Sequence, residues 1–370
     1  MSAGKAQKEE SLWMARCIEL ARKGYGFVRP NPMVGCVIVK KGKLIAEGYH
    51  KRFAGPHAEA DALRRAGKRA KGAVLYVNLE PCAHFGKTPP CVDAIIRSGI
   101  RKVVVGSLDP NPFVPGGGAR RLRKAGISVR VGVERTAAEF LNEKFYAFMK
   151  TGLPYVGYKV AQTLDGRIAD VHDSSKWITG FSSRRYAHAI RMGYDAVLIG
   201  AQTVRKDDPE LTVRHVVGPN PVRVVVDGRM SVPLQRRMFN GSQARTIILT
   251  SEKAYRQQSR TVRDLRSRRV EVIPVSKSWN LAPKSVLKTL AALGITSVLI
   301  EGGSDTAGRF LRSSIGGMLH CFVAPKIIGG GTESFRFSPP MKLPHALRLT
   351  RSTIRLLGED LLIEGSIEFA

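Results

Sequence analysis

Four residues between positions 57 and 91 carry side chains that could hold a metal ion and move a proton. His57 offers a ring nitrogen, and Cys82 and Cys91 offer thiolates. Glu59 follows the histidine by two positions. Mixed nitrogen and sulfur ligands suit Zn2+ in tetrahedral geometry, and three protein ligands leave the fourth position open, as in catalytic zinc sites. Zinc lowers the pKa of a bound water molecule toward neutrality, so Glu59 becomes the candidate proton carrier.

The histidine and the glutamate can face one ion only at the start of a helix. Residues two positions apart do not share a face of a helix. His57 and Glu59 must therefore lie in a first turn, where the chain enters from a loop. Gly55-Pro56 provides this entry, and residues 58–66 (AEADALRRA) form helices readily.

An alternative interpretation is that the two cysteines are ordinary buried thiols and His57 is a surface side chain. It is disfavoured because four spaced residue types fit one mechanism. The pattern HxE followed by PC is typical of zinc deaminases, in which the glutamate acts as general acid and base. The second cysteine comes nine positions after the first, which is farther than in the common deaminase pattern. The intervening AHFGKTPP must close over the metal, and it brings His84 and Lys87 toward the substrate.

The motif LEPCAHFGKTPPC, with NPMVGCVIV before it and DPNP after it, resembles the bifunctional deaminase/reductase family of riboflavin biosynthesis. The resemblance covers nearly the whole chain and implies an α/β fold in two domains. Residues 1–150 would form a zinc-dependent pyrimidine deaminase with a cytidine deaminase-like three-layer fold. Residues 151–370 would form an NADPH-dependent reductase with a dihydrofolate reductase-like fold. The resemblance also places Asn31 and His50 beside the pyrimidine, although Asn31 alone is equally typical of a turn before proline.

The first 150 residues are expected to alternate helices and strands, as in a layered α/β domain. The pattern predicts helices over residues 9–23, 92–98 and 134–149, a hairpin over residues 33–50, and strands at 73–78 and 102–106. Asp109, Asn111 and the glycines 116–118 follow the end of a strand, where α/β sheets bind ligands. We interpret these glycines as simple loop residues.

The most strongly patterned segment of the second half is SVLIEGGSDTAGR, at residues 297–309. An apolar strand leads into Gly302-Gly303, and a helix follows. Glycines let backbone N–H groups approach a phosphate, and a helix N-terminus adds partial positive charge, so a pyrophosphate fits. The spacing is not GxGxxG, and a classical dinucleotide-binding fold is therefore unsupported.

The resemblance implies further contacts in this half. The cofactor contacts that it implies are Ala161, Trp177, Thr203, Asp207, Gly228, Gly303, Ser304, Asp305, Thr306, Ala307, Gly308 and Arg309. The substrate contacts that it implies are Ser175, Arg191, Leu211, Arg214 and Glu301, the two arginines for a 5′-phosphate. Without the resemblance, Trp177 would be assigned to the core and the arginines to solvent. Family members often have serine where Gly228 stands, and no catalytic acid for the reduction is identified.

Composition limits the cellular setting and the class of partner. The 370 residues suffice for two cores, and no apolar run approaches the roughly 18 residues of a membrane span. The N-terminus lacks an apolar signal segment, and an odd number of cysteines suits a reducing compartment. We therefore expect a cytoplasmic homo-oligomer, with no membrane partner and a small phosphorylated pyrimidine as substrate.

The net charge of +30 admits two interpretations. It could serve nucleic-acid binding by counterion release, or it could be a solvated basic surface that serves anionic small molecules. We favour the second, because no aromatic-rich RNA-binding signature accompanies the charge. A tRNA-editing deaminase would use the same zinc residues, but it would not need residues 301–309 as a cofactor loop.

Overall fold

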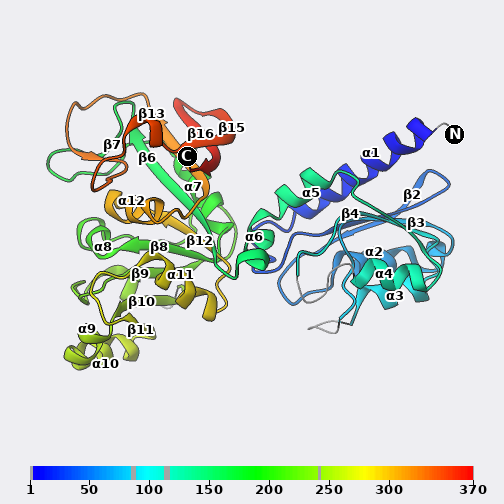
Figure 1. Ribbon diagram of the computed structural model, residues 1–370, viewed down its shortest axis with the longest axis horizontal. Coiled ribbons are helices and arrows are strands. Elements are labelled where there is room, and N and C mark those ends of the chain that lie inside the picture. The colour runs from blue at the N-terminus through cyan, green and yellow to red at the C-terminus, as the bar shows by residue number, and fades with distance from the viewer. Residues whose placement is uncertain (1–2, 85–88, 112–116, 241–242, 370) are drawn as a thin grey trace. The chain divides into compact units, whose positions relative to one another are not determined.

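The computed structural model describes residues 3–84, 89–111, 117–240 and 243–369 (Figure 1). The chain divides into two compact units, Met1–Gly152 and Leu153–Ala370. Among the described residues, none of the helices combines the length and apolar character needed to span a bilayer.

The first unit is built on a five-stranded sheet in the order β2-β1-β3-β4-β5. Its strands are β1 (Gly35–Lys40), β2 (Lys43–Tyr49), β3 (Val74–Leu79), β4 (Lys102–Ser107) and β5 (Ser128–Val131). The expected hairpin β1–β2 is antiparallel, whereas β3, β4 and β5 run parallel. Parallel strands end at the same edge, so the segments after β3 and β4 come together.

Helices cover both faces of this sheet, which gives the expected three layers (Figure 1). The helices are α1 (Ala3–Arg22), α2 (Ala58–Ala66), α3 (Cys91–Arg97), α4 (Gly117–Lys124), α5 (Arg135–Leu141) and α6 (Glu143–Thr151). Successive residues of a strand point to opposite faces. Cys36 and Ile38 of β1 therefore pack with α2, α3 and α4, whereas Val37 and Val39 pack with α1 and α5.

The prediction of a single helix over residues 134–149 is wrong, because the helix is interrupted at Asn142, between α5 and α6. The Asn142 side chain is buried and holds the backbone of Met33. Its Oδ1 accepts from the Met33 N–H at 2.8 Å, and its Nδ2 donates to the Met33 carbonyl at 2.9 Å. A distant hydrogen-bonding partner, rather than local propensity, sets this break.

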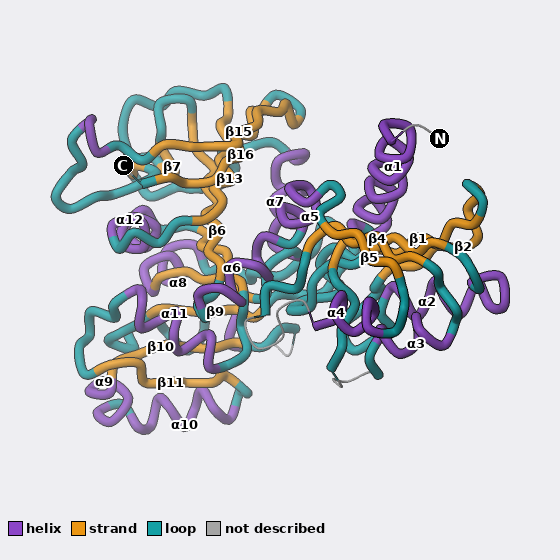
Figure 2. Tube along the Cα trace, turned by 45° about the vertical axis from the view of Figure 1, so that its right-hand side comes forward, coloured by secondary structure: helices purple, strands orange, loops and turns teal. Residues whose placement is uncertain are grey.

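The second unit is built on a nine-stranded sheet in the order β11-β10-β9-β8-β12-β6-β13-β16-β15 (Figure 2). The strands are β6 (Tyr155–Thr163), β8 (Ala196–Gly200), β9 (Val222–Val226), β10 (Thr246–Ser251), β11 (Val270–Ser276), β12 (Ser297–Glu301), β13 (Gly317–Ala324), β15 (Arg348–Leu357) and β16 (Asp360–Glu368). The first seven in spatial order run parallel, and β16 is antiparallel to both of its neighbours, β13 and β15. The seven parallel strands therefore present their carboxyl ends at one edge, where α/β sheets bind ligands.

Two hydrophobic clusters lie on opposite faces of this larger sheet. The helices are α7 (Phe181–Met192), α8 (Ala201–Asp207), α9 (Glu252–Gln257), α10 (Ser259–Ser267), α11 (Pro283–Ala292) and α12 (Ser304–Arg312). Helices α7, α9 and α10 bury side chains in one cluster, and α11 and α12 bury side chains in the other. A small sheet of β7 (Arg167–Ala169) and β14 (Thr332–Glu333) joins two loops.

Candidate active sites

His57, Cys82 and Cys91 gather their ligand atoms within 4.8 Å of one another. His57 Nδ1 lies 3.3 Å from the Sγ of Cys91 and 3.6 Å from the Sγ of Cys82. Zinc–nitrogen and zinc–sulfur bonds of about 2.0 and 2.3 Å at a tetrahedral angle put N and S about 3.5 Å apart. The donor set and its spacing therefore fit Zn2+.

Helix starts position His57, as the sequence indicated, and also Cys91, whereas Cys82 lies in the loop after β3. His57 has extended backbone angles and is the N-cap of α2, and Glu59 is the second residue of that helix. Cys91 is the first residue of α3, and its N–H donates to the Sγ of Cys82 at 3.3 Å. The histidine and the glutamate thus share the first turn, which lets them face one cavity.

Burial and neighbouring charges tune the acid–base groups of this site. Burial, with the charge of Cys82, raises the pKa of Glu59 to about 7, so the carboxyl can take up or release a proton near neutral pH. Hydrogen bonds from Cys91 and then from His57 outweigh burial and lower the pKa of Cys82 to about 4. A thiolate, the form that binds metal, is therefore favoured at Cys82.

A cavity of about 310 Å³ opens beside the ligand group. Its lining includes Asn31, His50, His57, Glu59, Cys82, His84, Asp109 and Asn111. His50 is buried and pairs through Nδ1 with the Pro56 carbonyl at 3.0 Å, so its Nε2 accepts from Asn31 Nδ2 at 3.3 Å. Asn31 therefore lines the cavity with its amide held by His50, and its contact with the pyrimidine stays a prediction. The remaining predicted contact, Lys87, lies outside the described residues.

A buried glutamate that the sequence did not single out supports one wall of this cavity. Glu80 accepts from the N–H of Asp109 at 3.1 Å and from that of Ala119 at 2.7 Å, so it joins the loop after β4 to α4. The interpretation of the glycines as simple loop residues is wrong for Gly117 and Gly118, which begin α4. A Cβ at Gly118 would meet the carbonyl oxygen of Pro81 at 2.0 Å, so only glycine permits this close approach beside Cys82.

A second cavity, of about 640 Å³, opens in the second unit. Predicted contacts that line it are Ala161, Ser175, Trp177, Thr203, Asp207, Gly303, Ser304, Asp305, Thr306 and Ala307. Gly302 and Gly303 have φ of 78° and 79° just before α12, so this wall is a left-handed glycine turn at a helix N-terminus. Trp177 is 66% exposed, which excludes its assignment to the core.

A buried ion pair lies at the end of β12, next to this cavity. Arg191 donates from Nε and Nη2 to the two oxygens of Glu301, at 2.7 and 2.9 Å, and from Nη1 to the Thr212 carbonyl at 2.5 Å. Burial alone would raise the pKa of Glu301, but the charge and hydrogen bonds of Arg191 and the charge of Lys159 lower it to about 2. The Arg191 guanidinium is thus engaged in hydrogen bonds to Glu301 and Thr212 in this structure.

Lys159 is a functional candidate that the sequence analysis missed. It lines the larger cavity, and its Nζ lies 3.8 Å from Glu301. Burial outweighs the attraction of Glu301 and lowers the pKa of Lys159. Buried titratable groups in a cavity are frequent at active sites. The available signal was a lysine inside the otherwise apolar strand YVGYKVA.

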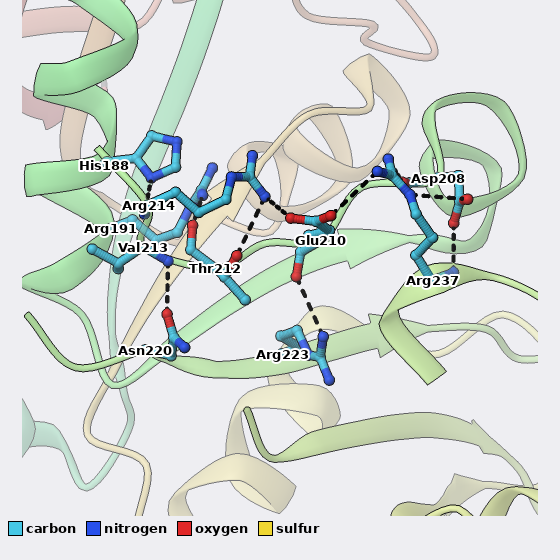
Figure 3. A network of polar contacts seen from close by, with 10 residues as sticks. All are labelled: His188, Arg191, Asp208, Glu210, Thr212, Val213, Arg214, Asn220, Arg223 and Arg237. Atoms are coloured by element: carbon cyan, nitrogen blue, oxygen red, sulfur yellow. Dashed lines mark hydrogen bonds and ion pairs between the residues drawn. The ribbon is translucent and has the colours of Figure 1, made fainter. Parts of the chain in front are cut away.

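The predicted phosphate arginines belong to a polar network around residues 208–214 (Figure 3). The Arg214 side chain contacts Glu210 and the Oγ1 of Thr212. The backbone N–H of Arg214 donates to His188 Nδ1 at 3.0 Å. Its side chain is 48% exposed, in contrast to the buried Arg191. Of the two arginines, Arg214 is therefore the more accessible to an anion. Leu211 is buried in the same segment.

Comparisons with known proteins agree with this geometry in both units. The family description "Cytidine and deoxycytidylate deaminase zinc-binding region" matches residues 7–107, and "RibD C-terminal domain" matches residues 154–363. The riboflavin biosynthesis protein RibD of Aquifex aeolicus is 45% identical, over 95% of this chain and 96% of its own length. The chain belongs to the RibD family. Its members are the bifunctional deaminase/reductases of riboflavin biosynthesis, so the chain is a bifunctional enzyme that uses Zn2+ and NADPH.

Other RibD relatives cover the chain equally fully. RibD of Escherichia coli is 38% identical over 96% of the chain and 98% of its own length. The solved structure of Acinetobacter baumannii RibD has a TM-score of 0.89 at 37% identity and covers 98% of this chain and 99% of its own. A Thermotoga maritima structure has a TM-score of 0.85 at 39% identity over 99% of this chain and 100% of its own. The two-domain α/β fold is therefore confirmed.

At three positions where the RibD pattern implies a cofactor contact, the residue packs against or hydrogen-bonds to another part of the chain. A Cβ at Gly228 would meet the Trp279 carbonyl oxygen at 1.9 Å, and one at Gly308 would meet the Arg336 carbonyl oxygen at 1.9 Å. Arg309 donates to the carbonyl of Leu281 at 2.6 Å. Cofactor contacts at these three positions stay predictions.

Proposed function

We propose that the first unit deaminates 2,5-diamino-6-(5-phosphoribosylamino)pyrimidin-4(3H)-one, and that the second unit reduces the ribosyl group of the product to ribityl with NADPH. The Thermotoga maritima relative is described as a diaminohydroxyphosphoribosylaminopyrimidine deaminase/5-amino-6-(5-phosphoribosylamino)uracil reductase. The observation that carries the proposal is the zinc-fitting donor set beside Glu59, in a cavity lined by Asn31 and His50.

In the deaminase cavity, the side chains divide into orienting groups and one proton carrier. A zinc ion held by His57, Cys82 and Cys91 supplies the Lewis acidity that activates water. Asn31, held by His50, offers an amide that can fix an edge of the pyrimidine. Glu59 takes a proton from the attacking water and passes it to the departing amino group, which leaves as ammonia. Because its pKa is about 7, this carboxyl can act in both directions.

In the reductase cavity, NADPH supplies the hydride and the chain supplies position and charge. Lys159 lines the cavity, and its Nζ lies 3.8 Å from Glu301, whereas Arg191 is already bound to that carboxylate. We assign it the proton that the sugar ring oxygen must gain as C1′ receives the hydride. Glu301, fixed by Arg191, holds the lysine in place. Arg214 is the candidate for the 5′-phosphate. Self-association of the chain and the lack of nucleic-acid binding stay predictions.

One assay of the purified chain tests the two activities together. With the proposed substrate and NADPH, ammonia release and NADPH oxidation are followed in the same sample. Glu59→Gln should abolish ammonia release while bound zinc remains stoichiometric, and it should keep the reduction of supplied deaminated product. Asp61→Asn is the matched control, because Asp61 lies in the same helix and pairs with Arg64 and Arg65. Undiminished ammonia release by Glu59→Gln would refute the proton-carrier role.

A further inference from the structure

A cation–aromatic cluster stands where three parallel strands of the second unit end. Arg229 follows β9, Lys253 follows β10, and Trp279 follows β11. The Arg229 guanidinium lies 5.3 Å from the centre of the Trp279 ring system, and the Lys253 Nζ lies 4.6 Å from it. Trp279 is 43% exposed, and both basic side chains are exposed. The cluster is therefore accessible to a ligand from solution.

Backbone packing fixes this cluster to the sheet edge that carries the larger cavity. The carbonyl of Trp279 fills the space that a side chain at Gly228 would need. The Ser251 N–H donates to the Gly228 carbonyl at 3.3 Å, which joins the ends of β9 and β10. Arg309 of α12 holds the carbonyl of Leu281, so the segment after β11 is also tied to the helix whose N-terminus lines the cavity.

The order of the strands gives a direction along this edge. Ala161 on β6 and the glycine turn after β12 line the cavity, and β8, β9, β10 and β11 follow in that order. Neighbouring strands are about 4.8 Å apart, so β9 lies about 10 Å beyond β12. A dinucleotide with its pyrophosphate at the α12 N-terminus and its nicotinamide toward β6 must extend its adenosine toward β9 and β10.

The charges of the cluster suit a phosphate. Among the described residues, neither Arg229 nor Lys253 forms an ion pair, although the acidic Glu252 directly precedes Lys253. Each cation lies instead against the Trp279 indole. The exposed part of the indole can pack against a purine, and two cations beside the same ring match the charge of a phosphate dianion.

We propose that Trp279 covers the adenine of NADPH and that Arg229 and Lys253 bind its 2′-phosphate. Arg229 and Lys253 then determine the preference for NADPH over NADH, and Trp279 contributes to the binding of both. The inference rests on the proposed reductase function and names the residues that recognise its cofactor. It also gives Gly228 a role, because only a residue without a side chain admits the Trp279 backbone at this point.

Steady-state reduction with each nicotinamide cofactor tests the assignment. For Arg229→Ala with Lys253→Ala, we expect the KM for NADPH to rise about tenfold or more, with kcat and the KM for NADH nearly unchanged. Trp279→Ala should raise both KM values. Arg260→Ala with Arg263→Ala matches the loss of two charges at exposed positions of α10 and should leave both unchanged. An unaltered NADPH/NADH preference in the double variant would overturn the proposal, provided that its thermal unfolding matches the wild type.

Calorimetric titration of the full chain separates this proposal from the proposed reductase function. Adenosine 2′,5′-bisphosphate should bind to the wild type at least about tenfold more tightly than 5′-AMP, and the double variant should bind the two equally. Equal binding by the wild type would overturn the 2′-phosphate site even if the chain reduces its substrate. Tight, variant-sensitive binding without NADPH oxidation would keep the site and refute the proposed reduction.

Discussion

The deaminase cavity and the reductase cavity reach function by different means. In the first, three ligands and a proton carrier come from a short stretch of chain, at the starts of two helices and in the loop after β3. In the second, a glycine turn, a helix N-terminus and a buried ion pair surround a space for a cofactor that brings its own chemistry. A metal site needs particular ligand atoms at fixed spacing, whereas the binding free energy of a cofactor is spread over many weak contacts. The first should therefore be easier to abolish by one substitution.

The sharpest difference between the cavities is expected from removing a metal ligand. Cys82→Ser should lose stoichiometric zinc and lower ammonia release by roughly a thousandfold or more, because the Lewis acid is worth several kcal/mol. Reduction of supplied deaminated product should be unaffected. Metal analysis and the two assays measure this. Cys321→Ser, at a buried thiol of the second unit, is the control. Full zinc retention in Cys82→Ser would contradict the ligand assignment.

A proton donor in the reductase cavity should be the next most sensitive position. Lys159→Met should lower NADPH oxidation by about a hundredfold, within the usual range for general acid catalysis, and leave ammonia release intact. In the wild type, the rate should fall as pH rises through the pKa of Lys159, which burial holds below its ordinary value. Lys150→Met, at an exposed lysine, is the control. A pH profile that Lys159→Met leaves unchanged would argue for a purely structural lysine.

The buried ion pair should act mainly on stability, and its effect should depend on pH. Glu301→Gln leaves Arg191 buried without its counter-charge and should cost about 3–5 kcal/mol in the unfolding of the second unit at neutral pH. The lowered pKa of Glu301, about 2, means that its carboxylate stabilises the fold above the ordinary value near 4.5. That contribution is lost as pH falls from about 4.5 toward 2. Urea unfolding at pH 7 and pH 4 should show the difference from wild type shrinking in acid.

The smallest effect is expected from the support behind the deaminase cavity. Asn142→Ala removes both hydrogen bonds to the Met33 backbone and should destabilise the first unit by about 1–3 kcal/mol. Because this segment also carries Asn31, the KM for the pyrimidine should rise a fewfold while zinc content stays the same. Unfolding curves and deaminase kinetics measure this. An unchanged KM would limit Asn142 to stability alone.

The two cavities also differ in how much the sequence predicted. The zinc group was predictable because His57, Glu59 and Cys82 stand in a short motif whose geometry follows from the start of a helix. The pairing of Arg191 with Glu301, 110 positions apart, leaves no local pattern, and Lys159 is recognised only once its burial is known. The same limit applies to the expected helix over residues 134–149, which a distant backbone partner divides.

Gly118 gives a second case of this limit. Glycine after a strand is common in loops, and sequence alone cannot distinguish a flexible turn from a close approach of two backbones. Here the distance to the Pro81 carbonyl decides the matter. By contrast, the alternation of strands and helices in both halves followed from hydrophobic periodicity, because burial on two faces of a sheet is imposed residue by residue.

The position of His57 at the N-cap of α2 has a consequence for the loss of metal. The opening turn of a helix has unsatisfied N–H groups and frays first. His57 is the N-cap residue of α2, so its coordination to zinc would hold the start of this helix in place. Removing the ion should therefore loosen the turn that carries Glu59. Chelation would then lower ammonia release in two ways, because the Lewis acid is lost and the acid–base residue is no longer held in position.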